Sequence, residues 1–106
     1  MREIEFRGQC AFSGALRYGF YRKHNNNHII VTEEGNESII LIKTLGQYIG
    51  HKDKNNVKIF ENDRVLYDGV LGNVFYSEDL AMFMVRFDYT NSVYSFDTLD
   101  RDVEVV

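Results

Sequence analysis

The chain has 106 residues, close to the commonest domain size, so a single domain spanning residues 1–106 is expected. Its formal net charge of -4 argues against a protein that coats nucleic acid non-specifically, because such binding needs Lys and Arg to displace counterions from phosphates. Cys10 is the one cysteine of the sequence, which excludes an intrachain disulfide framework and a thiolate-rich zinc site.

The first third of the chain alternates apolar and polar residues with a period of two. Ile4 and Phe6 share one face of a first expected strand, and Leu16, Tyr18 and Phe20 share one face of a second. Seven Tyr and eight Phe, with neither Trp nor Pro, also favour strands. These patterns predict an antiparallel, mainly-β protein.

A hairpin is expected next. Residues 28–32 and 38–42 are β-branched and apolar, and residues 33–37 between them form a turn in which Gly35 can take positive φ. An Asn turn at residues 25–27 precedes the first of these strands.

From residue 43 to residue 63 the alternation stops. The composition shifts to Gly, Asn, Lys and Asp, which predicts a long irregular connection. Such a connection is either functional or packed by its own side chains. The apolar anchors available for packing are Leu45, Tyr48, Ile49, Val57, Ile59 and Phe60.

Regular strands resume in the last part of the chain. A β-meander is expected over residues 64–67, 70–76 and 82–87, and strands at 93–96 and 103–106 close the chain. The acidic link between the last two strands is expected to form one helical turn.

No catalytic or metal-binding constellation is recognisable. The histidines, His24, His28 and His51, lack a second cluster to complete a zinc site. Asp53 opens a segment like a calcium loop, but Lys58 stands where that loop needs Gly, and Arg64 where it needs Glu. No nucleophile elbow or phosphate loop is present. We therefore expect a protein that is not an enzyme and has no metal or cofactor.

The start of the sequence alternates charged and apolar residues, unlike a secretion signal. The longest apolar run, residues 39–42, is too short to cross a bilayer. The expected compartment is the cytoplasm.

Two segments together, residues 1–7 and 46–65, resemble the YopX proteins, small accessory proteins of bacteriophages and prophages. Tyr18-Gly19-Phe20 stands where that family has an aromatic-Gly-aromatic strand, and residues 72–74 and 103–106 also fit. The resemblance implies a largely β fold, a phage or prophage setting and no associated reaction.

The sequence departs from the family pattern in two places. Asn56 and Asn62 stand where the family usually has Gly, and because Asn tolerates left-handed backbone, positive φ is expected at both. Members of the family also tend to continue past the last strand with a Gly-Asn-Ile-type tail, whereas the sequence given ends at Val106.

Together these observations predict an N-terminal hairpin layer and a C-terminal SH3-like small barrel, joined by the segment 46–63. The residues expected to shape that segment are Gly46, Gly50, Asn56, Phe60, Asn62 and Asp63.

The favoured function is a non-catalytic phage-encoded protein that binds a host or phage protein, for example to modulate host defence or metabolism. The alternatives are a nucleic-acid-binding module and a nucleotide- or small-molecule-binding protein. Basic side chains interleaved with rings can hold a single strand of nucleic acid. The candidate binding surface is therefore Tyr48, His51, Lys52, Lys54 and Lys58.

Overall fold

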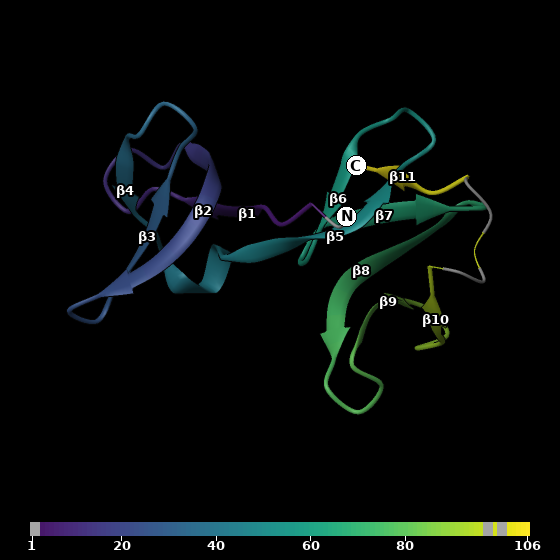
Figure 1. The fold of residues 1–106 in the computed structure, drawn as a ribbon. Helices are drawn as coiled ribbons and strands as arrows, with labels where there is room; N and C mark the ends of the chain where they lie inside the picture. The colour runs from purple at the N-terminus through teal and green to yellow at the C-terminus, as the bar shows by residue number, and fades with distance from the viewer. Residues whose placement is uncertain (1–2, 97–98, 100–101) are drawn as a thin grey trace. The chain divides into compact units, whose positions relative to one another are not determined.

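A computed structural model describes residues 3–96, 99 and 102–106 of the chain. These residues form β-strands and one short helix, which confirms the mainly-β prediction. The strands are β1 (Phe6–Gln9), β2 (Leu16–His24), β3 (Asn27–Val31), β4 (Glu37–Ile39), β5 (Gly46–Lys52), β6 (Lys58–Phe60), β7 (Arg64–Tyr67), β8 (Val70–Ser77), β9 (Met82–Phe87), β10 (Val93–Ser95) and β11 (Glu104–Val105), and the helix is the 3₁₀-helix η1 (Ile42–Thr44) (Figure 1).

The chain folds as two compact units, Met1–Tyr48 and Ile49–Val106, called here the N-terminal and the C-terminal unit. Strand β5 begins in the first unit and ends in the second (Figure 1). The single domain expected from the sequence stays a prediction.

The N-terminal unit is an antiparallel sheet with the order β4-β3-β2-β1-β5. The expected hairpin is present as β3 and β4, with Ile29 opposite Ile39. Ile30 is fully buried, and Ile40 is also buried and approaches Gly8 so closely that a Cβ on Gly8 would lie 2.3 Å from the Ile40 side chain. The core of this unit is therefore built from β-branched residues around a glycine.

The second hairpin strand is shorter than the predicted 38–42. It ends at Ile39, Ile40 makes an isolated bridge to Cys10, and η1 begins at Ile42. The Thr44 hydroxyl explains the change, because it accepts a hydrogen bond from the Gln9 backbone N–H (2.8 Å) and donates one to the Leu41 carbonyl (2.6 Å). These bonds turn the chain away from the strand direction.

The segment 43–63 is not the irregular connection that was predicted. It contains β5 and β6, which pair as neighbours, with a turn between them. The prediction was wrong because Tyr48 and Ile49 are consecutive buried residues, so the strand does not alternate. Gly46 and Gly50 also lower the strand propensity of this segment, since glycine is depleted in strands.

The meander of the C-terminal unit is confirmed, with the strand order β10-β9-β8-β7-β11. Each of the strands β5 to β9 contributes at least one residue to its core, and so does the segment before β11. Its buried members are Ile49, Ile59, Val65, Val74, Val85, Phe87 and Val103. Closure of this unit into an SH3-like barrel stays a prediction.

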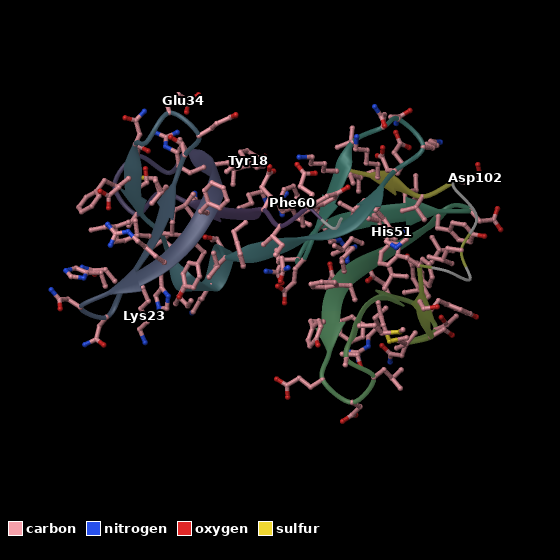
Figure 2. All side chains as sticks on the ribbon, in the orientation of Figure 1. Tyr18, Lys23, Glu34, His51, Phe60 and Asp102 are labelled. Atoms are coloured by element: carbon pink, nitrogen blue, oxygen red, sulfur yellow. The ribbon has the colours of Figure 1, made fainter. Side chains whose placement is uncertain are left out.

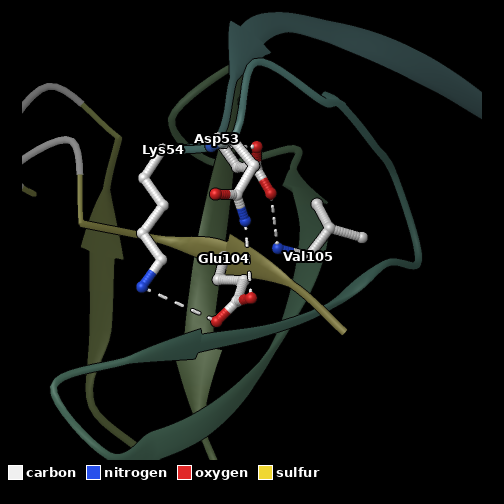
Figure 3. A network of polar contacts seen from close by, with 5 residues as sticks. Asp53, Lys54, Glu104 and Val105 are labelled. Atoms are coloured by element: carbon white, nitrogen blue, oxygen red, sulfur yellow. Dashed lines mark hydrogen bonds and ion pairs between the residues drawn. The ribbon is translucent and has the colours of Figure 1, made fainter.

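A network of polar contacts attaches the last strand to the turn after β5 (Figure 3). The Val105 backbone N–H donates to Asp53 Oδ2 (2.9 Å), and the Lys54 N–H donates to the Val103 carbonyl (2.9 Å). The Lys54 ammonium also forms an ion pair with Glu104, at 3.7 Å. The short strand β11 is thus held by this network in addition to its pairing with β7.

The helical turn expected in the acidic link involves residues 97, 98, 100 and 101, which lie outside the described residues. Over the part of the chain that the structure describes, no helix is long and apolar enough to span a membrane.

Candidate functional site

The predicted binding surface lay within the segment 46–63, whose phenyl and phenol rings are buried. Tyr48 is 5% exposed and Phe60 is 3% exposed. Tyr48 therefore cannot serve as a surface residue, and its placement in that surface was wrong. Ile49 and Ile59, at 4% and 1% exposure, are buried too, which confirms that these residues anchor the segment.

The four polar residues of the predicted surface have different surroundings. His51 and Lys52 are exposed at the end of β5, and the His51 ring stacks on Phe96 with centroids 5.9 Å apart. Lys54 pairs with Glu104, and Lys58 is half-buried. The four polar side chains thus lie at or near the surface, whereas Tyr48 and Phe60 are buried. Their role in binding stays a prediction.

Two asparagines of this segment have the backbone conformation that the family glycines indicate. Asn56 has φ 65° and Asn62 has φ 77°, which confirms the prediction of positive φ. Gly50 also has positive φ, at 89°. Asp63, which follows the second asparagine, is buried and accepts a hydrogen bond at Oδ2 from the Phe60 N–H (2.8 Å).

The Asp53 carboxylate organises the first of these turns. Its Oδ1 accepts hydrogen bonds from the backbone N–H groups of Asn55 and Val57, each at 2.8 Å, in addition to the Val105 bond at Oδ2. Burial disfavours the charged carboxylate, but the three N–H donors outweigh it and lower the pKa of Asp53. The calcium-like sequence is thus a turn closed by its own backbone.

The most exposed apolar strand face of the N-terminal unit is on β2. Leu16, Tyr18 and Phe20 are 52%, 45% and 67% exposed, whereas Arg17 and Gly19 between them are half-buried. The alternation of this strand was predicted correctly. The orientation of its two faces is unusual, because the large apolar side chains point toward solvent.

The inward position of Gly19 accounts for this direction. A Cβ on Gly19 would lie 2.1 Å from the Val31 carbonyl oxygen, so only glycine allows β3 to lie this close. With Gly19 facing inward, its two neighbours on the strand must face outward, since side chains alternate along a strand.

A groove of about 590 Å³ lies over this face of β2. Its floor includes Leu16, Tyr18 and Phe20, and two segments form its walls. One is residues 3–5, before β1, and the other is residues 32–34, in the turn after β3. Figure 2 labels Tyr18 on β2 and Glu34 in that turn. We call this feature the β2 groove.

The lining of the β2 groove is apolar at the floor and acidic at the walls. Four carboxylates line it, those of Glu3, Glu5, Glu33 and Glu34, against one guanidinium, that of Arg17. Ile4, which is 59% exposed, extends the apolar surface between two of the acidic residues. The groove thus combines apolar contact area with a negative potential.

A second cavity, of about 480 Å³, lies beside β8 and β9 in the C-terminal unit, and several of its lining side chains already have partners. Arg64 donates to both carboxylate oxygens of Asp88, at 3.0 and 2.6 Å, and to Asn73. The hydrogen bonds from Arg64 lower the pKa of Asp88, and the same contacts raise that of Arg64. Arg86 lies over the Phe75 ring, at 4.8 Å. These contacts hold the β7–β9 surface together.

Cys10 is free and buried, as a small apolar residue would be. Hydrogen bonds from the Ser13 side chain and from the Ser13 and Phe12 backbone lower the pKa of its thiol to about 7. Among residues 3–96, 99 and 102–106, no three His, Cys, Asp or Glu side chains are grouped so that they could hold a metal ion.

The model of the YopX protein family matches residues 8–105, nearly the whole chain. The chain belongs to the YopX family. The match includes β2 and the turn after β3, so two of the three segments that form the β2 groove lie within it. A comparison of this YopX chain with curated proteins found no match.

The sequence reasoning missed the β2 groove in the YopX chain. The signal was present as three large apolar residues flanking Gly19, but the alternation was interpreted only as evidence for a strand. Alternation along a strand shows that one face is apolar, but it does not show whether that face is buried in the core or exposed to solvent.

Proposed function

We propose that this YopX chain is a small, phage-type accessory protein that binds a host or phage protein and catalyses no reaction. The observation that carries the proposal is the outward apolar face of β2. Large exposed apolar side chains gathered on one face and rimmed by polar residues are typical of protein-binding sites. Tyr and Phe are also among the residues enriched at protein interfaces.

Burial of this face would contribute substantially to affinity. Full burial of a side chain such as Leu or Phe is worth about 1.5–3 kcal/mol. Leu16 and Phe20 keep half or more of their surface in solvent and therefore retain much of this free energy for a partner.

The nucleic-acid alternative receives less support. Tyr48, the phenol ring of the predicted surface, is buried, as is the neighbouring Phe60 ring of the same segment, and stacking on bases requires exposed ring faces. The β2 groove does have exposed rings, but its acidic walls would repel phosphates.

The proposed compartment is the cytoplasm of a bacterial host, where the chain would meet a host or phage protein.

The test is affinity purification of the whole chain from a bacterial host, with and without nuclease treatment. We expect a stoichiometric protein partner that survives nuclease and is lost with the double variant Leu16→Ser/Phe20→Ser. Lys52→Glu, in the predicted surface of segment 46–63, should retain the partner. Copurified nucleic acid that is lost with Lys52→Glu would instead support the alternative.

A further inference from the structure

The turn after β3 places two carboxylates at the wall of the β2 groove. Glu33 and Glu34 line the groove and are exposed, and neither forms an ion pair with another residue that the structure describes. The backbone of this turn is held by hydrogen bonds of its own, from the Thr32 N–H to the Asn36 carbonyl (2.8 Å) and from the Gly35 N–H to the Thr32 carbonyl (2.9 Å). The two carboxylates thus keep their charge at a defined place in the fold.

An exposed aromatic ring lines the same groove. Phe20 is 67% exposed, and it pairs with Val31, the last residue of β3, so it lies where the turn that contains Glu33 and Glu34 begins. The face of an aromatic ring attracts a cation, and carboxylates accept strong hydrogen bonds from cationic donors. A ring and two carboxylates in one groove are therefore suited to a cationic side chain.

We infer that the β2 groove binds an arginine side chain of the partner protein, which stacks on the Phe20 ring and pairs with the carboxylates of Glu33 and Glu34. The inference rests on the proposed function and specifies the chemistry of the partner. Arginine suits this groove better than lysine, because its planar guanidinium stacks on rings and presents a fork of N–H donors to carboxylates. The ammonium of lysine is a more strongly hydrated point charge.

The apolar part of the groove determines the neighbours of that arginine. Leu16 and Ile4 line the groove together with Phe20 and are 52% and 59% exposed. The volume of about 590 Å³ is in the range of small-ligand pockets, so the groove holds a few side chains of a partner. We therefore expect apolar residues on either side of the arginine, where they would cover Leu16 and Ile4.

The charge of the walls disfavours a second copy of this chain as the occupant. Four carboxylates line the groove against the one guanidinium of Arg17, so its local charge is negative. A two-fold interface would place this patch against itself, and Glu33 and Glu34 of one copy would meet the same carboxylates of the other. Like charges brought together in an interface weaken binding, whereas a basic partner is attracted.

Fluorescence anisotropy with the full chain tests the inference. The probes are labelled five-residue peptides with a central Arg, Lys or citrulline flanked by Leu, citrulline being a neutral side chain of the shape of arginine. We expect the Arg peptide to bind about tenfold more tightly than the citrulline peptide, with the Lys peptide between them. Its affinity should fall severalfold as NaCl rises from about 50 to about 300 mM, because exposed charges are screened. Equal affinity for the Arg and citrulline peptides, or no binding of the Arg peptide, would overturn the inference.

Neutralising the two carboxylates shows where the charge is recognised. Glu33→Gln/Glu34→Gln removes both charges with little change of shape, so the Arg and citrulline peptides should bind this variant with nearly equal affinity. Glu78→Gln, in the exposed turn after β8, is the matched control and should keep the preference for Arg. A preference that survives Glu33→Gln/Glu34→Gln means that the charge is recognised elsewhere, which contradicts the inference.

Replacement of the ring tests the stacking contact. Phe20→Leu keeps an apolar side chain and should weaken binding of the Arg peptide about twofold to fivefold, while circular dichroism shows that the fold is retained. Phe12→Leu, at a residue that is 84% exposed and outside the groove, should leave the affinity unchanged. If Phe20→Leu binds the Arg peptide as tightly as the wild type does, the arginine does not stack on this ring and the inference is wrong.

Failure of the inference is distinguishable from failure of the proposed function. If the Arg peptide does not bind but a protein partner is still lost with Leu16→Ser/Phe20→Ser, the function stands and the stated partner chemistry is wrong. If the Arg peptide binds as expected but affinity purification yields no protein partner, the inference stands and the proposed function fails. If sedimentation shows a dimer that dissociates with Phe20→Ser, a second copy of the chain occupies the groove, and the inference is overturned.

Discussion

Val105 donates its backbone N–H to the buried carboxylate of Asp53, with 2.9 Å between the N and Oδ2 atoms. This bond joins the turn after β5 to the last strand, 52 residues further along the chain. Because β11 consists of two residues, its attachment depends heavily on such contacts. The same carboxylate also closes its own turn, because it accepts hydrogen bonds from the Asn55 and Val57 N–H groups. One side chain therefore stabilises both this turn and the attachment of β11.

Asp53→Ala should therefore destabilise the C-terminal unit. Three backbone N–H groups would lose a charged acceptor, and we expect a loss of about 2–4 kcal/mol in the free energy of unfolding at pH 7. Urea unfolding measures it, with Asp79→Ala, at an exposed turn position, as the control. A loss no larger than that of the control would contradict the assigned role.

The contribution of Asp53 should also depend on pH. Its pKa in the folded chain is lowered, so the stability it contributes is present above the unfolded pKa, about 3.9. That contribution is lost as the pH falls through the lowered folded value. The difference in stability between the wild type and Asp53→Ala should thus shrink below about pH 4. A difference that stays constant down to pH 2 would show that the charge is not involved.

Phe60→Ala should cost about 3–5 kcal/mol, as for other large-to-small changes in a protein core. Phe60 is 3% exposed, so truncation of its ring would leave a buried cavity. Val57→Ala is the matched control from the same segment, since Val57 is 47% exposed and should lose little. An unchanged melting midpoint for Phe60→Ala would overturn the anchor role of this ring.

Asn56→Gly and Asn62→Gly should be neutral or mildly stabilising. Both residues have left-handed backbone, which glycine adopts without the steric cost of a Cβ. Asn56→Val should in contrast lose about 1–2 kcal/mol, because a β-branched residue is unfavourable in this conformation. Thermal melting of the three variants measures the ranking of their stabilities. An Asn56→Val variant that is more stable than Asn56→Gly would contradict the prediction.

Most of the fold follows from patterns that the sequence displays directly. The period of two at Leu16, Tyr18 and Phe20 and the turn at Gly35 indicate a strand and a hairpin by local rules. The first expected strand is only partly correct, because Ile4 precedes β1, which begins at Phe6. The positive φ of Asn56 and Asn62 follows from steric tolerance and the family pattern.

The features that sequence reasoning missed depend on long-range contacts. Strand β5 is buried at consecutive residues, Tyr48 and Ile49, so a rule based on alternation cannot detect it. The outward face of β2 depends on the approach of Val31 to Gly19, 12 residues away in the chain. A periodic pattern shows that two faces differ, and only the tertiary structure determines which one is covered.

The approach of Val31 to Gly19 gives the last prediction. A Cβ at position 19 would lie 2.1 Å from the Val31 carbonyl oxygen and 3.1 Å from the Thr32 Cα, so Gly19→Ala must push β3 away from β2. We expect a loss of about 1–3 kcal/mol, the usual cost of overpacking, because backbone atoms cannot give way as a side-chain end can. Phe20→Ala, at the next residue, removes an exposed ring and should cost much less. Urea unfolding compares the two, and hydrogen exchange should show weaker protection at Tyr21 and Ile30, which face each other across β2 and β3. If Gly19→Ala is as stable as Phe20→Ala, the close approach of the two strands does not orient the β2 face, and the outward position of Leu16, Tyr18 and Phe20 needs another cause.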